Sequence, residues 1–145
     1  MKEFMASTTI AASSEVIWAI LTDAASYPEW DPGMIRLEGT IAQGEKITAY
    51  TKISPDRAFP VVVDIVAKGK KMTWSSAMPL GAFAGMRTFT LDDQGDGTVK
   101  FKAHEQFTGW MLPIIGRTIP DLTDSFVNFV TGLKTRAEET MKHVE

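Results

Sequence analysis

The amino-acid sequence predicts an α+β fold in which a strongly curved antiparallel β-sheet of about seven strands wraps around a long C-terminal helix. Three observations support this prediction. Six strand-like segments between residues 34 and 109 follow one another with only short gaps, which implies hairpins. One further strand-like segment and one or two short helical segments precede them. An amphipathic segment from Asp121 to Lys142 comes last and is long enough to cross a small sheet.

Length and composition favour one compact domain spanning residues 1–145. The chain is 44% hydrophobic and 23% charged, carries a net charge of −3 and has no basic patch, so a nucleic-acid partner is not expected. It contains no cysteine, which excludes disulfides, thiolate metal sites and cysteine nucleophiles. The N-terminus lacks the apolar core of a signal peptide, and no apolar run reaches the roughly 20 residues of a membrane span. The expectation is a soluble cytoplasmic protein.

The N-terminal part is expected to form a strand, a helix and a broken turn. Loose alternation and β-branched residues predict a strand over residues 3–11. Ser13 and Ser14 are typical helix-capping residues. Apolar residues at helical spacing follow over residues 15–27, and Pro28 disfavours continuation of that helix. The stretch "YPEWDPG" is expected to be a turn with a second short helical piece.

The middle of the chain is expected to form a meander of strands. Turn-forming residues separate the strand-like segments, as in "SPDR" at 54–57 and "DDQGDG" at 92–97. The expected strands cover residues 34–42, 45–53, 59–67, 71–78, 83–91 and 98–107. Because the gaps are short, neighbouring strands should pair in antiparallel fashion.

The C-terminal segment has one apolar and one charged face, as expected for a helix that packs on a sheet. The apolar face is formed by Leu122, Phe126, Phe129, Val130, Leu133, Ala137 and Met141. Two positions are open for the start of this helix. If it begins near Asp121, Pro120 lies in its first turn. If it begins near Ile114, Pro120 kinks it.

The strand over residues 98–107 carries one carboxylate, Glu105, on its apolar face. The preceding strand carries Arg87 on the corresponding face. A register with Phe89 opposite Phe101 would place Arg87 diagonally from Glu105, within reach of a long side chain. An unpaired carboxylate on this face would be costly, so an ion pair of Arg87 and Glu105 is a hypothesis, and the sequence leaves open whether the two residues pair. The pair is either structural or a polar site that faces a ligand, with the arginine to hold an oxygen and the glutamate to orient it.

Five motifs lie in order along nearly the whole chain: "SSEVIWAILTDAASYPEWDP", "MTWSSAM", "GMRTFTL", "GTVKFKAHEQFTG" and "FVTGLKTRAEE". In order and spacing they resemble the START-like superfamily, also called Bet v 1-like or SRPBCC, and within it the polyketide cyclase/dehydrase-type branch. The resemblance implies a helix-grip fold with an apolar cavity between the long helix and the sheet. It does not assign an activity, because this fold hosts carriers, enzymes, receptors and co-chaperones.

The leading hypothesis is the binding of a small, mostly apolar ligand in that cavity, such as a lipid, a quinone or a polyketide-like molecule. Arg87 and Glu105 are the expected polar contacts. The other expected ligand-binding residues are Trp74, Ser76, Phe89, Phe101, Phe107, Leu122, Phe126, Phe129, Val130 and Leu133. Core packing is the simpler explanation for Trp74. No cofactor is expected, and two isolated histidines make no metal site.

Two alternatives remain. In a polyketide cyclase/dehydratase-type enzyme, Glu105 would act as general base or orient a water, and Arg87 would stabilise an enolate oxygen. In a protein-interaction or co-chaperone-like role, the apolar run "WMLPII" would be a protein contact. The resemblance implies that this run lies beside the cavity entrance. Trp110, Met111 and Leu112 would form a lip there or a homodimer contact, unless the run folds back and is buried.

Overall fold

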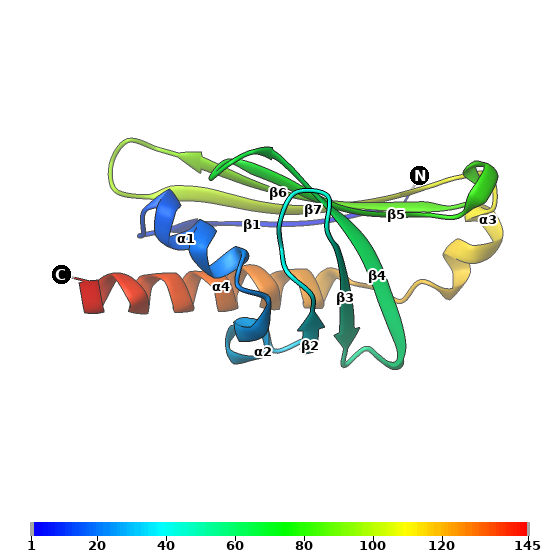
Figure 1. The fold of residues 1–145 in the computed structure, drawn as a ribbon, viewed down its shortest axis with the longest axis horizontal. Coiled ribbons are helices and arrows are strands. Elements are labelled where there is room, and N and C mark those ends of the chain that lie inside the picture. The colour runs from blue at the N-terminus through cyan, green and yellow to red at the C-terminus, as the bar shows by residue number, and fades with distance from the viewer. Residues whose placement is uncertain (1, 145) are drawn as a thin grey trace.

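The computed structural model describes residues 2–144, and these residues fold into one curved sheet of seven strands that grips a long helix (Figure 1). The strands are β1 (Lys2–Ile10), β2 (Met34–Glu38), β3 (Lys46–Thr51), β4 (Ser54–Ala67), β5 (Lys71–Ala77), β6 (Ala84–Asp93) and β7 (Val99–Thr108). The helices are α1 (Ser14–Leu21), α2 (Tyr27–Trp30), α3 (Leu112–Ile115) and α4 (Thr123–Val144).

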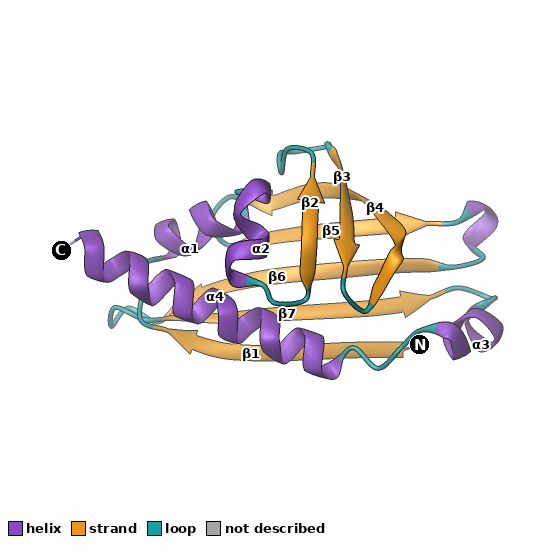
Figure 2. Cartoon of the chain, turned by 90° about the horizontal axis from the view of Figure 1, so that it is seen from below, coloured by secondary structure: helices purple, strands orange, loops and turns teal. Residues whose placement is uncertain are grey.

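All neighbouring strands are antiparallel, in the spatial order β1-β7-β6-β5-β4-β3-β2. The first strand therefore lies beside the last, as two segments far apart in the sequence. Figure 2 shows α4 crossing the concave side of the sheet over β1 and β7, while β2, β3 and β4 form the opposite wall. The predicted α+β class, the antiparallel meander and the gripped helix are confirmed. In the part of the chain that the structure describes, no helix is long and apolar enough to cross a membrane.

The strand β4 is longer than the sequence pattern predicts. The segment 54–57, expected as a turn, is the beginning of β4, and only Lys52 and Ile53 separate it from β3. Pro55 is tolerated here because the pairing of β4 with β5 begins only at Val62, so its missing N–H removes no bond to β5. The strand β2 is shorter than expected and is followed by Gly39, whose φ of +105° suits only glycine.

The first helix begins as predicted and ends early. The hydroxyl of Ser13 accepts a hydrogen bond from Val16 N at 3.2 Å, so Ser13 is the N-cap. The helix ends at Leu21, six residues before the predicted end, because Asp23 leaves the helical region with φ −100° and ψ 89°. The second helical piece, α2, is present and carries Pro28 in its first turn, where a missing N–H costs nothing.

The long helix α4 begins at Thr123, close to the first of the two predicted starts. The Asp121 carboxylate accepts hydrogen bonds from the backbone N–H of Thr123 at 3.0 Å and from its hydroxyl at 2.7 Å. Pro120 lies in the connection ahead of α4, so it neither opens nor kinks the helix. The region near Ile114 is the separate helix α3, which ends at Ile115.

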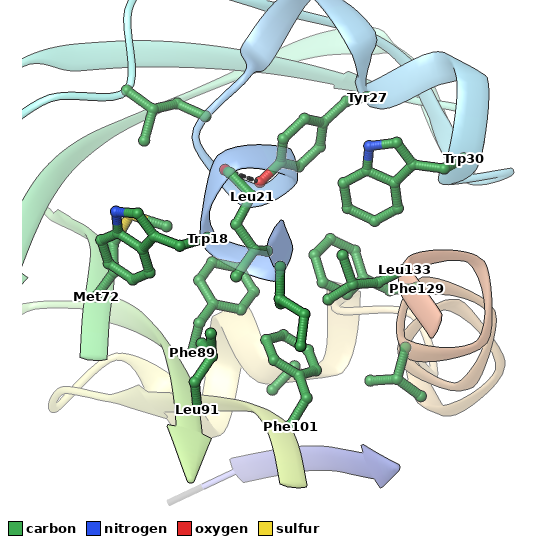
Figure 3. Packing of buried hydrophobic residues seen from close by; sticks show 14 of the residues in the cluster. Trp18, Leu21, Tyr27, Trp30, Met72, Phe89, Leu91, Phe101, Phe129 and Leu133 are labelled. Atoms are coloured by element: carbon green, nitrogen blue, oxygen red, sulfur yellow. Dashed lines mark hydrogen bonds between the residues drawn. The ribbon is translucent and has the colours of Figure 1, made fainter. Parts of the chain in front are cut away.

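Aromatic rings fill the centre of the core between α4 and the sheet (Figure 3). The ring centroid of Phe129 lies 5.4 Å from that of Phe89 and 6.2 Å from that of Phe101. On another side, Phe129 contacts Trp30 of α2, with centroids 5.1 Å apart. All four side chains are buried. The middle of the concave face is therefore closed by packing between the helix and the sheet.

Candidate functional site

Arg87 of β6 lies directly opposite Glu105 of β7, and its Nε is 3.4 Å from Glu105 Oε2. The ion pair that the sequence left open is therefore present. The register assumed for it was wrong, because Phe89 pairs with Ala103 and not with Phe101. Arg87 and Glu105 are direct cross-strand neighbours rather than diagonal ones, so the distance that their side chains must span is shorter than expected.

The turn between β6 and β7 explains this shift of register. Asp92 and Asp93 belong to β6 and not to the turn, and Asp93 pairs with Val99. The loop closes with a hydrogen bond from Gln94 N to Thr98 O at 3.0 Å. The centre of the β6–β7 turn therefore lies later in the chain than the expected register requires. Each residue of β6 consequently pairs with a residue of β7 that lies two positions later than expected.

The inward-facing side chains of β5, β6, β7 and β1 form rows across the sheet. The outermost row is Ser76, Gly85, Phe107 and Lys2; the next is Trp74, Arg87, Glu105 and Phe4; the third is Met72, Phe89, Ala103 and Ala6. Solvent exposure decreases from the outermost row to the third row. In the outermost row Ser76 is exposed and Phe107 is half-buried, whereas Met72 and Phe89 of the third row are fully buried. The concave face is thus accessible at the end near the start of α4, and the ion pair lies at the border between the accessible end and the packed centre.

The Arg87–Glu105 pair has an apolar neighbour on the helix. The guanidinium carbon of Arg87 lies 4.6 Å from the ring centroid of Phe126, in a cation–π contact. The side chain of Arg87 is 26% exposed and that of Glu105 13% exposed. Partial burial makes it costly to leave either charge without its partner, so the pair holds the two side chains in place.

Asp31, which follows α2, is a second buried carboxylate, and no local sequence pattern marks it. It is only 6% exposed, and its Oδ1 accepts a hydrogen bond from Gly33 N at 3.1 Å. Burial raises the pKa of Asp31 above its ordinary value, while the Gly33 N–H and the charges of Arg87 and Lys52 act in the opposite direction. The stretch "WDPG" is expected to be a turn, and in the structure Asp31 is buried whereas the adjacent Pro32 is exposed.

Three buried polar atoms have no hydrogen-bond partner among the described residues: Trp74 Nε1, Thr51 Oγ1 and Trp30 Nε1. Trp74 lies opposite Arg87 on the neighbouring strand, and its ring centroid is 5.9 Å from that of Tyr27. A buried donor without an acceptor costs free energy unless a ligand or water supplies one.

The predicted ligand-binding residues divide into two groups. Phe89, Phe101, Phe129, Val130, Leu133 and Trp74 have exposed fractions of 0–5% and belong to the packed core. Arg87, Glu105 and Ser76 keep some exposure, as do Phe107 and Leu122, while Phe126 is buried against Arg87. The expected hollow at the centre of the grip is therefore filled by side chains. That the second group contacts a ligand stays a prediction.

Two hollows lie elsewhere, on the outer side of α4. One, of ≈ 430 Å³, lies between α2 and α4 and includes Trp30, Gly132 and Arg136. The other, of ≈ 270 Å³, lies between α1 and α4 and also includes Arg136. Both are open to solvent, and neither is lined by Arg87, Glu105 or Asp31.

The apolar run after β7 is tied to the connection between β5 and β6. Met111 N donates to Ala82 O at 2.8 Å, and the Trp110 indole donates to Leu80 O at 3.1 Å. Trp110 is 67% exposed, whereas Met111 and Leu112 are half-buried. A lip at the mouth of the site and a homodimer contact both stay predictions for these residues.

The family model described as "Polyketide cyclase / dehydrase and lipid transport" matches residues 1–138. The chain belongs to this family. The resemblance to the START-like superfamily noted in the sequence is thereby confirmed. No sequence match to a curated protein was found.

Solved structures of similar fold cover nearly the whole chain. A START superfamily protein from Mycobacterium smegmatis is 18% identical, with a TM-score of 0.72 over 95% of this chain and 98% of that one. The aromatase/cyclase Zhui from a Streptomyces species is 11% identical, with a TM-score of 0.73 over 97% and 95%. A norcoclaurine synthase point mutant from a Thalictrum species is 17% identical, with a TM-score of 0.70 over 97% and 96%. At these identities the likeness shows the fold alone.

We expect Asp31→Asn to stabilise the protein at neutral pH, by about 1 kcal/mol, the usual size of a single substitution. Burial raises the pKa of Asp31 in the folded state above the 3.8 of the unfolded chain, so folding favours the protonated carboxyl. The stabilisation that Asp31 gives in its protonated form is complete below the pKa of the unfolded chain. It is lost as the pH rises through the higher pKa of the folded state. Asparagine does not titrate.

Urea unfolding of the wild type and of Asp31→Asn at a series of pH values from 4 to 7 (roughly the range from ordinary carboxyl titration to neutrality) would measure this difference. Glu29→Gln is the control, because Glu29 is an exposed carboxylate of α2, two residues before Asp31, whose pair with Arg136 lies at the surface. A variant that is less stable than the wild type at pH about 7 would contradict the expectation.

Proposed function

We propose that this protein binds a small, mostly apolar ligand at the accessible end of the concave face, between β5, β6, β7 and the start of α4. The observation that carries the proposal is the Arg87–Glu105 pair, which faces inward among apolar side chains and remains partly exposed. A packed core has little use for such a pair, because apolar residues of similar size are often equally stabilising. A binding site has a use for it, since it fixes the orientation of a ligand.

The surroundings of the pair support the same proposal. Ser76 and Phe107 continue the inward face beyond it and are accessible, so a ligand can approach from that end. Phe126 and Phe107 offer apolar contact on either side, while Arg87 and Glu105 offer hydrogen bonds. The family description includes lipid transport, and a START superfamily protein has the same fold. Each is consistent with an apolar ligand.

Ser76→Trp is expected to weaken the binding of the neutral fluorescent probe N-phenyl-1-naphthylamine by about tenfold or more, the equivalent of 1.4 kcal/mol. Ser76 is exposed on the inward face, so an indole there occupies the space of the ligand without disturbing the core. Fluorescence titration of the probe measures the affinity.

Ser75→Trp is the matched control. Ser75 is the adjacent residue, and its side chain points to the opposite, convex face of β5. We expect the control to bind the probe as the wild type does. Equal loss of binding in both variants, or no saturable binding by the wild type, would refute the proposed site.

A further inference from the structure

One end of the molecule is covered by exposed apolar side chains. This apolar tip consists of residues 78–83, which join β5 to β6, and residues 109–116, which follow β7 and include α3. Both segments lie at one end of the long axis, opposite the C-terminus (Figures 1 and 2). Leu80 is 93% exposed, Ile114 69% and Trp110 67%. Exposed apolar side chains gathered in one place mark an interaction surface.

The two segments of the apolar tip form one connected surface. Met111 N donates to Ala82 O at 2.8 Å, and Trp110 N donates to Gly81 O at 3.4 Å. Gly109 permits this close approach, because a Cβ atom there would overlap the backbone of Ala82, and its φ of +120° suits glycine. The exposed side chains of both segments therefore act together.

The backbone of the apolar tip is strained at its most exposed residue. Leu80 has φ 62° and ψ 25°, in the left-handed region where leucine is rare and glycine or asparagine is common. Its side chain is almost fully in water, so packing does not compensate the strain. Strained residues of this kind concentrate at functional sites.

The apolar tip and its flanks carry almost no charge. Residues 77–86 and 107–120 contain no aspartate or glutamate, and the exposed Arg117 is their single charged residue. Lys2 adjoins the second segment, where its Nζ donates to two backbone carbonyls at 3.2 and 3.3 Å. The next carboxylate along the chain, Asp121, accepts hydrogen bonds at the start of α4. A lipid headgroup at the tip thus meets no carboxylate of these segments, and carboxylates are costly in a membrane.

Polar groups of the apolar tip are paired within it, as a surface that leaves water requires. The backbone N–H groups of Met78 and Ile114 donate to carbonyls of the tip at 2.8 and 3.0 Å. The indole of Trp110 donates to another carbonyl of the tip at 3.1 Å. Pro79 and Pro113 have no N–H to satisfy. These donors keep their partners when the tip loses its water.

A lipid surface fits the apolar tip better than a protein partner does. A standard protein interface takes roughly 20–30 residues from each side and about ten hydrogen bonds. The tip has fewer residues, and its exposed Leu80, Ile114 and Met78 side chains have no N–H or O–H group. A bilayer requires neither a matching shape nor matching hydrogen bonds, and tryptophan is typical of its interface.

We propose that the apolar tip docks on a lipid surface and places Leu80, Trp110 and Ile114 at the boundary between headgroups and acyl chains. Arg117 pairs with a lipid phosphate beside them. Both segments continue directly from β5 and β7, so docking brings the accessible end of the concave face to the lipid. This inference goes beyond the proposed function and does not rest on it, because docking needs no ligand.

Trp110 itself reports docking, because it is exposed whereas Trp18, Trp30 and Trp74 are buried. Vesicles of phosphatidylcholine with brominated acyl chains should quench the fluorescence of the wild type more than vesicles of ordinary phosphatidylcholine do. Ordinary vesicles should in turn protect the fluorescence from acrylamide, a quencher that stays in the water. Sedimentation with the same vesicles measures the affinity.

Leu80→Asn should weaken the binding to vesicles by about tenfold, because a large apolar side chain no longer enters the lipid. Asparagine is favoured over leucine in the left-handed region, so the variant should fold at least as stably as the wild type. Met5→Gln is the matched control, at a 57% exposed position on the convex face of β1, and should bind vesicles as the wild type does.

The proposal is overturned if the wild type does not sediment with vesicles, or if brominated and ordinary lipids quench it equally. Equal binding by Leu80→Asn and the wild type also overturns it. A wild-type dimer that Leu80→Asn dissociates, without binding to lipid, would assign the apolar tip to a second copy of this chain instead. Titration of N-phenyl-1-naphthylamine without vesicles tests the proposed function separately, so either proposal can fail while the other stands.

Discussion

Gly132→Ala is expected to destabilise the protein by about 3 kcal/mol or more, among the larger losses seen for single substitutions. Gly132 lies on α4 against the backbone at the end of α2. A Cβ atom built at Gly132 would overlap the backbone carbonyl oxygen of Trp30, so backbone and not a flexible side chain would have to move. Over-packing of this kind costs roughly 1–3 kcal/mol even where side chains can adjust.

The gain in helix propensity from replacing glycine by alanine opposes this loss of stability and is smaller than it. Alanine is favoured over glycine in a helix interior by about 1 kcal/mol. The net result is therefore a loss. The shift of α2 that relieves the overlap would also move Trp30 away from Phe129 and displace Asp31. We thus expect the variant to lose ligand binding as well as stability.

Urea unfolding followed by circular dichroism measures the loss. Thr131→Ala is the matched control, because Thr131 is the exposed neighbour of Gly132 on the same helix and alanine is the better helix former. The control should be as stable as the wild type or slightly more stable. A Gly132→Ala variant that gained stability like the control would show that α2 does not approach α4 as described.

The order of elements could be predicted from the sequence because it depends on local patterns. Alternation of apolar and polar residues identified every strand, and the spacing of phenylalanines in the last helix identified its buried face. The same alternation placed Arg87 and Glu105 on one face of a hairpin. It could not fix their register, which depends on where the turn between the strands is centred.

The burial of Asp31 could not be predicted because nothing local marks it. It depends on how the whole chain packs around the turn that follows α2. The filled centre of the grip is a similar case. The sequence names the residues that face inward, but whether their rings meet or leave a hollow depends on distances of a few ångströms between α4 and the sheet.

Phe129→Ala, which removes a ring from the filled centre, is expected to lower the free energy of unfolding by about 4 kcal/mol. This value lies within the range for truncation of a buried phenylalanine. The ring of Phe129 touches Trp30, Phe89 and Phe101 from three directions. Those neighbours belong to three different elements, α2, β6 and β7, so they cannot all move into the space. Urea unfolding measures the loss, and Val127→Ala, at a 48% exposed position of the same helix, is the control.

The same variant tests whether the ring is what closes the hollow predicted for this fold. A dry cavity lined by aromatic and aliphatic side chains binds small apolar molecules such as benzene. Benzene should therefore raise the melting temperature of Phe129→Ala and leave that of the wild type unchanged, because a ligand that binds only the folded state stabilises it. If the variant were destabilised by less than about 1 kcal/mol and did not respond to benzene, the neighbours would have collapsed into the space. In that case the filled centre would be a property of the sheet's curvature and not of one phenylalanine, and the accessible end at Arg87 would be the part of the concave face left to receive a ligand.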